Sequence, residues 1–426
     1  MFWIAPERRK GMKQINGGVT APNGFLAADT AAGIKYANRT DMALVYSAYP
    51  TVCAGTFTTN VVKAAPVKRD IKIVKKGGNV QAVVINSGIA NACTGKDGDK
   101  DDLAMAKAVA ECLGLKATEV FTASTGVIGR RLPVEKAVAG IKKMTENLDA
   151  SKDAGTRAAK AIMTTDTVEK QCAVETKIAG KKITIGGMSK GSGMIHPNMA
   201  TMLGVVTTDA DIDQKALQKA VSDAVSVSFN MISVDRDTST NDSLFALANG
   251  KAGNKKIVAG SDDYKEFYEA LLFVLTYLAK HMAADGEGAT KLIECKVLNA
   301  KSKKDAVTLS KSVITSNLTK AAVYGKDANW GRILCALGYS GAVFNPEKVD
   351  ITIEGRDDIE GKLVAKPLQL VKDGMDSGYS EKTATKILSA KVVTIIADMH
   401  GGQANATAWG CDLTHEYVDI NADYRS

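Results

Sequence analysis

The sequence of 426 residues contains little that a nucleic-acid, membrane or zinc-binding protein would need. Aromatic residues make up only 5% of it, too few for platforms on which bases stack. No apolar run approaches the roughly 20 residues of a membrane-spanning helix, and the best candidate run is Ala270–Leu275. The seven cysteines include no CxxC pair, which argues against structural zinc and against a disulfide framework. We therefore expect no bound metal and a reducing compartment, the cytoplasm.

The remaining composition is that of an ordinary globular chain. Apolar residues account for 45% and charged residues for 24%, both near the average for folded proteins. The formal net charge of +8 is spread along the chain, which is too weak a signal for a nucleic-acid partner but favours small anions. The length predicts two or three packed units. The first residues do not form the apolar stretch of a signal peptide, so no export is expected.

Short β-type runs alternate with helical patterns, which predicts a mixed α/β architecture with helices outside the sheets. Strands are predicted at 42–49, 54–59, 81–86, 119–123, 181–187, 201–209, 293–298, 350–354 and 391–397. Helices are predicted at 101–113, after Pro133, and at 215–229, 263–282, 330–337 and 384–388. In the first helix, Leu103, Ala106 and Val109 recur at helical spacing and predict the apolar face.

The glycine-rich segment 186–204 could hold one of three kinds of site. Residues 187–191, GMSKG, match the GxSxG pattern of a nucleophile elbow around Ser189, although a glycine and a proline follow where the elbow's helix should begin. Glycines together with Lys190 could instead cradle a phosphate, but the P-loop pattern GxxxxGK[ST] is absent.

The third possibility depends on the pair Ala200 and Thr201. Cleavage between them would make Thr201 an amino-terminal residue, with a hydroxyl nucleophile and its own α-amine as general base. Such a site needs no histidine, and the chain has only four. By composition alone, an ordinary strand threonine is the favoured interpretation of Thr201.

Two acidic clusters could in principle hold a cation. The first contains Asp235, Asp237 and Asp242, and the second spans residues 97–102. Neither has the ligand spacing of a calcium-binding loop. We therefore predict turns that hold a loop at the first cluster and a solvated helix start at the second.

Ten sequence blocks, together with the segment KGSGMIHPNMATMLG (190–204), closely resemble the ornithine acetyltransferase (glutamate N-acetyltransferase) family of arginine biosynthesis. The blocks follow in order from about residue 12 to the last residue: INGGVTAPNGF (15–25), FTTNVVKAAPV (57–67), NSGIANACTG (86–95), STGVIG (124–129), IMTTDT (162–167), DTSTND (237–242), DGEGATK (285–291), NWGRILCALGYSG (329–341), TAWGCDLT (407–414) and INADY (420–424). One such block would be weak evidence, but ten in order are specific.

The resemblance implies a precursor that cleaves itself between Ala200 and Thr201 into two chains that stay together. Thr201 would take acetyl from N2-acetyl-L-ornithine and pass it to L-glutamate in a ping-pong reaction that needs no cofactor, with acetyl-CoA as a possible second donor. The implied fold is a layered α-β-β-α sandwich that resembles N-terminal-nucleophile hydrolases with different connectivity. It is accompanied by a smaller C-terminal α/β domain. The resemblance also implies that two processed pairs, each of one alpha and one beta chain, associate.

The resemblance also implies a division of the chain and a set of site residues. Residues 1–11 are an extension outside the match, 12–200 form the alpha chain, 201–291 the beta-chain core, and 292–426 the C-terminal domain, whose tail returns to the active site. Thr125 and Gly126 would form the oxyanion hole. Substrate contacts would come from Thr164, Lys190, Thr201, Glu287, Asn421 and Ser426.

The chain departs from the family's pattern at three positions. Ile89 stands where the family usually has Asn, Arg236 where it usually has Gly, and Ser426 where Thr is expected. Because Asn caps turns in loops, Ile89 puts the local loop geometry in question. Two other functions remain open: an N-terminal-nucleophile amidase or aminopeptidase of the same fold, and an uncleaved binding protein with a basic glycine-rich loop.

Overall fold

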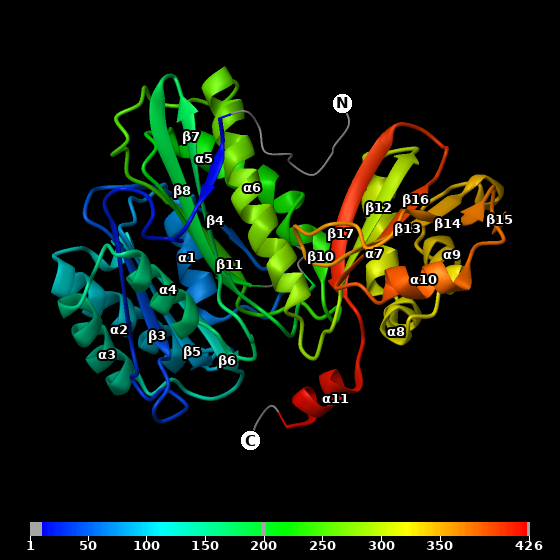
Figure 1. Ribbon diagram of the computed structural model, residues 1–426. Helices are drawn as coiled ribbons and strands as arrows, with labels where there is room; N and C mark the ends of the chain where they lie inside the picture. The colour runs from blue at the N-terminus through cyan, green and yellow to red at the C-terminus, as the bar shows by residue number, and fades with distance from the viewer. Residues whose placement is uncertain (1–10, 197–201, 424–426) are drawn as a thin grey trace. The chain divides into compact units, whose positions relative to one another are not determined.

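The computed structural model describes residues 11–196 and 202–423, which divide into two compact units (Figure 1). The sandwich unit holds the described residues up to Asn230, together with Asp237–Ala279. The C-terminal unit holds Met231–Arg236 together with the described residues from Lys280 onwards. No helix of the described ranges combines the length and the apolar character required to cross a membrane.

The sandwich unit contains a six-stranded and a four-stranded sheet. The first has the strand order β1-β7-β8-β9-β11-β4 and the second β2-β3-β5-β6. Their strands are β1 (Lys13–Ile15), β2 (Phe25–Thr30), β3 (Met42–Ser47), β4 (Val52–Phe57), β5 (Ala82–Ile89), β6 (Val120–Val127), β7 (Lys170–Ile178), β8 (Lys181–Lys190), β9 (Leu203–Thr208) and β11 (Ser243–Ala248). The helices are α1 (Ala65–Lys75), α2 (Gly95–Leu113), α3 (Val134–Glu146), α4 (Lys152–Ala161), α5 (Gln214–Ser226) and α6 (Asp262–Ala284), whose last turn falls in the C-terminal unit.

The two sheets pack face to face over one apolar core. In it, Phe121 of β6 stacks on Phe245 of β11 with ring centroids 4.6 Å apart, and Met188 of β8 joins the same cluster. The outer face of the four-stranded sheet is covered by α2 and α3, which supply Val109 and Ile141 to a second cluster. These two aromatic side chains thus serve the core.

The outer face of the six-stranded sheet is covered by α5 and α6. Gln218 of α5 both donates to and accepts from the backbone of Gly55 in β4, at 3.0 Å each. A Cβ on Gly187 of β8 would lie 3.1–3.2 Å from Val274 and Leu278 of α6, so this helix sits closely on the strand. The layers run helix, sheet, sheet, helix, and the predicted α-β-β-α sandwich is confirmed (Figure 1).

The predicted apolar face of the helix 101–113 is confirmed for Ala106 and Val109, which are fully buried, and wrong for Leu103. The helix begins earlier, at Gly95, and Leu103 is 39% exposed while Asp101 and Asp102 are buried. Asp101 accepts hydrogen bonds from Arg131, and Asp102 accepts one from the Thr122 hydroxyl. The predicted solvated helix start is therefore also wrong for these two carboxylates, because their partners allow them to be buried.

The C-terminal unit is built on one seven-stranded sheet with the order β10-β17-β12-β16-β13-β14-β15. Its strands are β10 (Ile232–Ser233), β12 (Leu292–Ala300), β13 (Asp350–Arg356), β14 (Leu368–Lys372), β15 (Met375–Asp376), β16 (Val392–Asp398) and β17 (Ala404–Cys411). Its helices are α7 (Lys303–Thr315), α8 (Asn317–Gly325), α9 (Trp330–Gly338), α10 (Glu381–Leu388) and α11 (His415–Ala422). Trp409 is fully buried and donates through Nε1 to Glu294 at 2.7 Å.

Each predicted strand and helix finds a counterpart, with ends shifted by a few residues. The strand predicted at 201–209 is β9, which spans Leu203–Thr208, and residue 201 lies outside the described ranges. The division of the chain at residues 11, 200 and 291 stays a prediction.

Candidate active site

The end of β6 carries the two residues expected to form an oxyanion hole, Thr125 and Gly126. Gly126 is paired in register with Gly88 of β5 and has a φ of +126°. A Cβ at Gly126 would lie 2.2 Å from the carbonyl carbon of Gly88. Only glycine fits here, because both the positive φ and the close approach of the neighbouring backbone exclude a side chain.

Lys190, the last residue of β8, brings three of the predicted site residues together. Its Nζ lies 2.7 Å from the Thr164 hydroxyl and 3.4 Å from the Thr125 hydroxyl. The lysine side chain is only 9% exposed, so these contacts replace most of its hydration. Thr125, Thr164 and Lys190 are far apart in the sequence and form one polar cluster in the sandwich unit.

Asp166 completes this cluster and is not among the residues predicted from the sequence. Its side chain is fully buried and accepts hydrogen bonds from Lys170 Nζ at 2.7 Å, from the Gly191 N–H at 2.7 Å and from the Thr164 N–H at 3.0 Å. Lys190 Nζ lies 3.7 Å away. Burial alone would raise the pKa of Asp166, but the Lys190 and Lys170 ammonium groups hold that pKa well below its usual range.

The cluster therefore contains two ammonium groups and one ionised carboxylate. One positive charge is left in excess beside the Thr125 hydroxyl, which suits a group that becomes negative during a reaction. The signal that could have pointed to Asp166 was the block IMTTDT, in which it stands two residues after Thr164.

Ala200 and Thr201 lie outside the described residues, but the chain on both sides of them is anchored. Before them, the Thr238 hydroxyl donates to the carbonyl of His196 at 3.0 Å. After them, the Ser243 N–H donates to the carbonyl of Met202 at 2.8 Å. Leu203, two residues after Thr201 in the sequence, is the register partner of Lys190.

Asn241, in the block DTSTND, ties the start of β11 to the end of β6. It is 7% exposed, and its Nδ2 donates to the carbonyl of Ser124 at 2.7 Å and to that of Ala90 at 2.6 Å. Because Ser124 directly precedes Thr125, this amide fixes the backbone that carries the candidate oxyanion hole. As predicted, the DTSTND segment serves as a hydrogen-bonded loop.

The C-terminal unit holds two more of the predicted residues. Glu287 is 6% exposed and accepts a hydrogen bond of 2.7 Å from Asn421 Nδ2 of α11. The loop that carries Glu287 is held in place by the Thr414 hydroxyl, which donates to the carbonyl of Gly288 at 2.7 Å. Ser426 lies outside the described residues.

The two other kinds of site considered for the segment 186–204 find no support. Ser189 is fully buried inside β8, which is paired on both sides by β7 and β9, so it does not stand at a strand-to-helix turn. Lys190 points its ammonium at two hydroxyl groups and a carboxylate, not into a glycine-rich loop.

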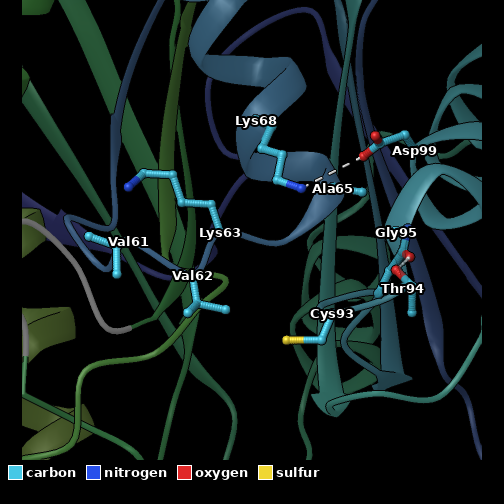
Figure 2. Close-up of a pocket in the computed structure, with 10 residues that line it drawn as sticks. Val61, Val62, Lys63, Ala65, Lys68, Cys93, Thr94, Gly95 and Asp99 are labelled. Carbon is cyan, nitrogen blue, oxygen red and sulfur yellow. Dashed lines mark hydrogen bonds and ion pairs between the residues drawn. The ribbon is translucent and has the colours of Figure 1, made fainter.

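A pocket of about 200 Å³ lies in the sandwich unit, near the starts of α1 and α2 (Figure 2). The residues shown around it include Val61, Val62, Lys63, Cys93, Thr94 and an ion pair of 4.0 Å between Lys68 and Asp99. None of the predicted site residues that the structure describes is among those lining it.

Comparison with known proteins decides the family. The sequence model of the ArgJ family matches residues 26–426. The chain belongs to the ArgJ family. A curated relative from Symbiobacterium thermophilum, named arginine biosynthesis bifunctional protein ArgJ, is 51% identical over 421 residues, which cover 97% of this chain and 100% of the relative. A protein of the same name from Caldanaerobacter subterraneus is 48% identical over 415 residues, covering 97% of this chain and 100% of the relative.

Two solved structures of similar proteins extend this comparison. The arginine biosynthesis bifunctional protein ArgJ from Bacillus halodurans is 44% identical, with a TM-score of 0.48, and covers 52% of this chain and 99% of its own. An ornithine acetyltransferase complexed with ornithine, from Mycobacterium tuberculosis, is 43% identical, with a TM-score of 0.41, and covers 45% of this chain and 99% of its own. The resemblance found in the sequence is confirmed.

Two of the three departures from the pattern that the resemblance implies can be placed in the structure. Ile89 is the last residue of β5, not a loop residue, and its side chain is 4% exposed in the cluster that also contains Val127. Arg236 is exposed and has a φ of +72°, the left-handed region in which glycine is favoured. The glycine usual at this position would adopt that backbone without strain, whereas Arg236 is strained there.

Proposed function

We propose that this protein is a self-cleaving acetyltransferase that moves acetyl from N2-acetyl-L-ornithine to L-glutamate through an acyl-Thr201 intermediate. Its membership of the ArgJ family places it among enzymes of arginine biosynthesis. The observation that carries the finer proposal is that the Lys190 ammonium group lies within hydrogen-bonding distance of both the Thr125 and the Thr164 hydroxyl. These residues are the ones to which the sequence resemblance assigns the oxyanion hole and substrate contacts.

The proposed reaction has two acyl-transfer steps. After cleavage, the α-amine of Thr201 accepts the hydroxyl proton as the oxygen attacks the acetyl carbonyl, and the same proton goes to the leaving amine of ornithine. The acetyl group stays on Thr201 as an ester. The amine of glutamate then attacks this ester, loses a proton to the α-amine, and leaves as N-acetylglutamate while the hydroxyl is restored.

The oxyanion formed in both steps needs fixed donors. We assign this role to the Thr125 hydroxyl and the Gly126 N–H, beside the excess positive charge of the Lys190 cluster. Donors that are already in place stabilise the tetrahedral state more than the planar carbonyl, which is the condition for a faster reaction.

Substrate binding is assigned to Thr164, Lys190, Glu287, Asn421 and Ser426, as the resemblance implies. Ornithine and glutamate share an α-amine and an α-carboxylate and differ in side-chain charge, so groups of both signs are needed to accept both.

Because the relatives are named bifunctional, acetyl-CoA is proposed as a second acetyl donor. No cofactor is required, and we propose cytoplasmic action by two associated, processed pairs.

The experiment that tests this proposal combines intact mass with turnover. Purified wild type should give two polypeptides that together account for the 44.9 kDa chain, and Thr201→Ala a single, inert one. Ornithine release from N2-acetylornithine should depend on glutamate. Release that is unaffected by glutamate would instead indicate a hydrolase, and full activity of an uncleaved chain would refute the Thr201 mechanism.

A further inference from the structure

Asp166 takes no part in the proposed reaction, yet its carboxylate contacts two residues of the candidate site, Thr164 and Lys190. Oδ1 accepts from Lys170 Nζ and the Gly191 N–H, and Oδ2 accepts from the Thr164 N–H and faces Lys190 Nζ. With its side chain fully buried, Asp166 cannot exchange these partners for water. It therefore fixes the loop before β7 and the end of β8 relative to each other.

The three protons of the Lys190 ammonium group face three oxygen atoms: those of the Thr164 hydroxyl at 2.7 Å, the Thr125 hydroxyl at 3.4 Å and Asp166 Oδ2 at 3.7 Å. An ammonium group donates hydrogen bonds and cannot accept them. Both hydroxyl oxygens must therefore accept from Lys190, so their own protons point away from it. A hydroxyl that accepts from a cation is also a stronger donor.

Lys170 explains why Lys190 stays near the hydroxyl groups. Lys170 is 1% exposed and holds Oδ1 of Asp166 at 2.7 Å. The carboxylate is therefore shared between two ammonium groups, and the short contact of Lys190 is to Thr164, not to Asp166. Without Lys170, the full attraction of the carboxylate would act on Lys190 and draw it away from Thr125.

We propose that Asp166, together with Lys170, is a positioning residue for the oxyanion hole. It holds the Lys190 ammonium between Thr125 and Thr164, and the ammonium turns both hydroxyl protons towards the substrate. This inference rests on the function proposed above and deepens it, because it gives Lys190 a second role beside its substrate contact, that of orienting the two hydroxyls. A group that orients donors for the transition state affects kcat, whereas a group that binds the substrate equally in both states affects KM.

The test compares Asp166→Asn with a matched control, Asp41→Asn. Asp41 is also buried, at 3% exposure, but accepts from the backbone N–H groups of Ala32 and Ile34, at 2.7 and 2.6 Å. Rates are measured with N2-acetylornithine and glutamate and divided by the fraction of cleaved chain. Asp166→Asn should lower kcat at least tenfold with KM changed less than threefold, while Asp41→Asn leaves both within about twofold.

A double-mutant cycle with Thr125→Val separates positioning from general damage to the fold. If Asp166 acts through Thr125, the loss of kcat caused by Thr125→Val should be at least fivefold smaller in the Asp166→Asn background than in wild type. If Asp166 is merely structural, the two losses multiply, and that result would overturn the proposal. So would a kcat for Asp166→Asn equal to that of Asp41→Asn.

Lys170→Met repeats the test should Asp166→Asn fail to fold. It should lower kcat at least fivefold with little change in KM, and an unchanged kcat would overturn the proposal. A wild type that transfers no acetyl would refute the proposed function and this inference together, whereas an active wild type with multiplicative losses refutes the inference alone.

Discussion

Gly88 and Gly126 face each other in neighbouring strands so closely that a Cβ on Gly126 would lie 2.2 Å from the carbonyl carbon of Gly88. The relationship is a backbone-to-backbone contact, so no rotation of a side chain can relieve a substitution. It places a strict geometric requirement at the candidate oxyanion hole, one residue from the Thr125 hydroxyl.

The substitution Gly126→Ala should therefore reduce kcat at least a hundredfold, because the strand must move to admit the methyl group. Gly129→Ala is the matched control, since Gly129 also has a positive φ, of +79°, but a Cβ there meets nothing within 4 Å. The control should cost about 1 kcal/mol of stability and little activity. Equal activity of the two variants, measured on the cleaved enzyme, would contradict this assignment.

The Thr125 side chain is expected to raise kcat by donating its hydroxyl proton in a hydrogen bond, and not by filling space. Thr125→Val keeps the shape and removes the donor, so kcat should fall by about 10²–10³. Thr125→Ser keeps the donor and should retain kcat within about tenfold of wild type. Steady-state rates of acetyl transfer decide the matter, and a valine variant as fast as the serine variant would exclude the hydroxyl from the oxyanion hole.

The backbone strain at Arg236 should lower the free energy of unfolding. Because φ is +72° at this exposed residue, Arg236→Gly should be more stable than Arg236→Ala by about 1 kcal/mol, the cost of a left-handed backbone for a residue with a Cβ. Chemical or thermal unfolding of the two variants side by side measures the difference. Equal stabilities would mean that the positive φ is not retained in solution.

Burial raises the pKa of Asp102 to about 6, although Arg69 and the hydrogen bond from Thr122 act in the opposite direction. The folded state therefore binds this proton more tightly than the unfolded state does, whose ordinary value is 3.8. Stability should consequently fall as the pH rises from about 4 to about 6, by on the order of 3 kcal/mol from this group.

The substitution Asp102→Asn should weaken this pH dependence. Glu111→Gln is the control, because the Glu111 side chain is exposed in the same helix and is not among the groups that shift the pKa of Asp102. Thermal midpoints recorded between pH 4 and 7 give the comparison. A slope for Asp102→Asn identical to that of wild type would show that Asp102 is not the group responsible.

Local patterns predicted most of the elements, since strand and helix periodicities depend on near neighbours in the chain. Leu103 was wrongly assigned to the apolar face of α2 for the same reason: Asp101 and Asp102 are buried instead, against Arg131 and Thr122, which lie far along the sequence. The spacing of Leu103 carries no information about such partners.

The arrangement of the candidate site could likewise be predicted only in part from the sequence. The resemblance named Thr125, Thr164 and Lys190, but their meeting around one ammonium group depends on contacts 26 and 65 residues apart in the chain. Asp166 was not singled out although it stands in the block IMTTDT, because a lone aspartate in a loop is usually a turn residue. Only the presence of two flanking lysines makes this carboxylate distinctive.

The order of strands in the six-stranded sheet, β1-β7-β8-β9-β11-β4, bears on what a cut before Thr201 would leave. β8 and β4 would belong to the first product, while β9 and β11, which lie between them, would belong to the second. The two strands of the second product would thus be hydrogen-bonded on both sides to strands of the first product. Separating the products would require breaking two ladders of backbone hydrogen bonds, so scission would create a fresh terminus without releasing either piece.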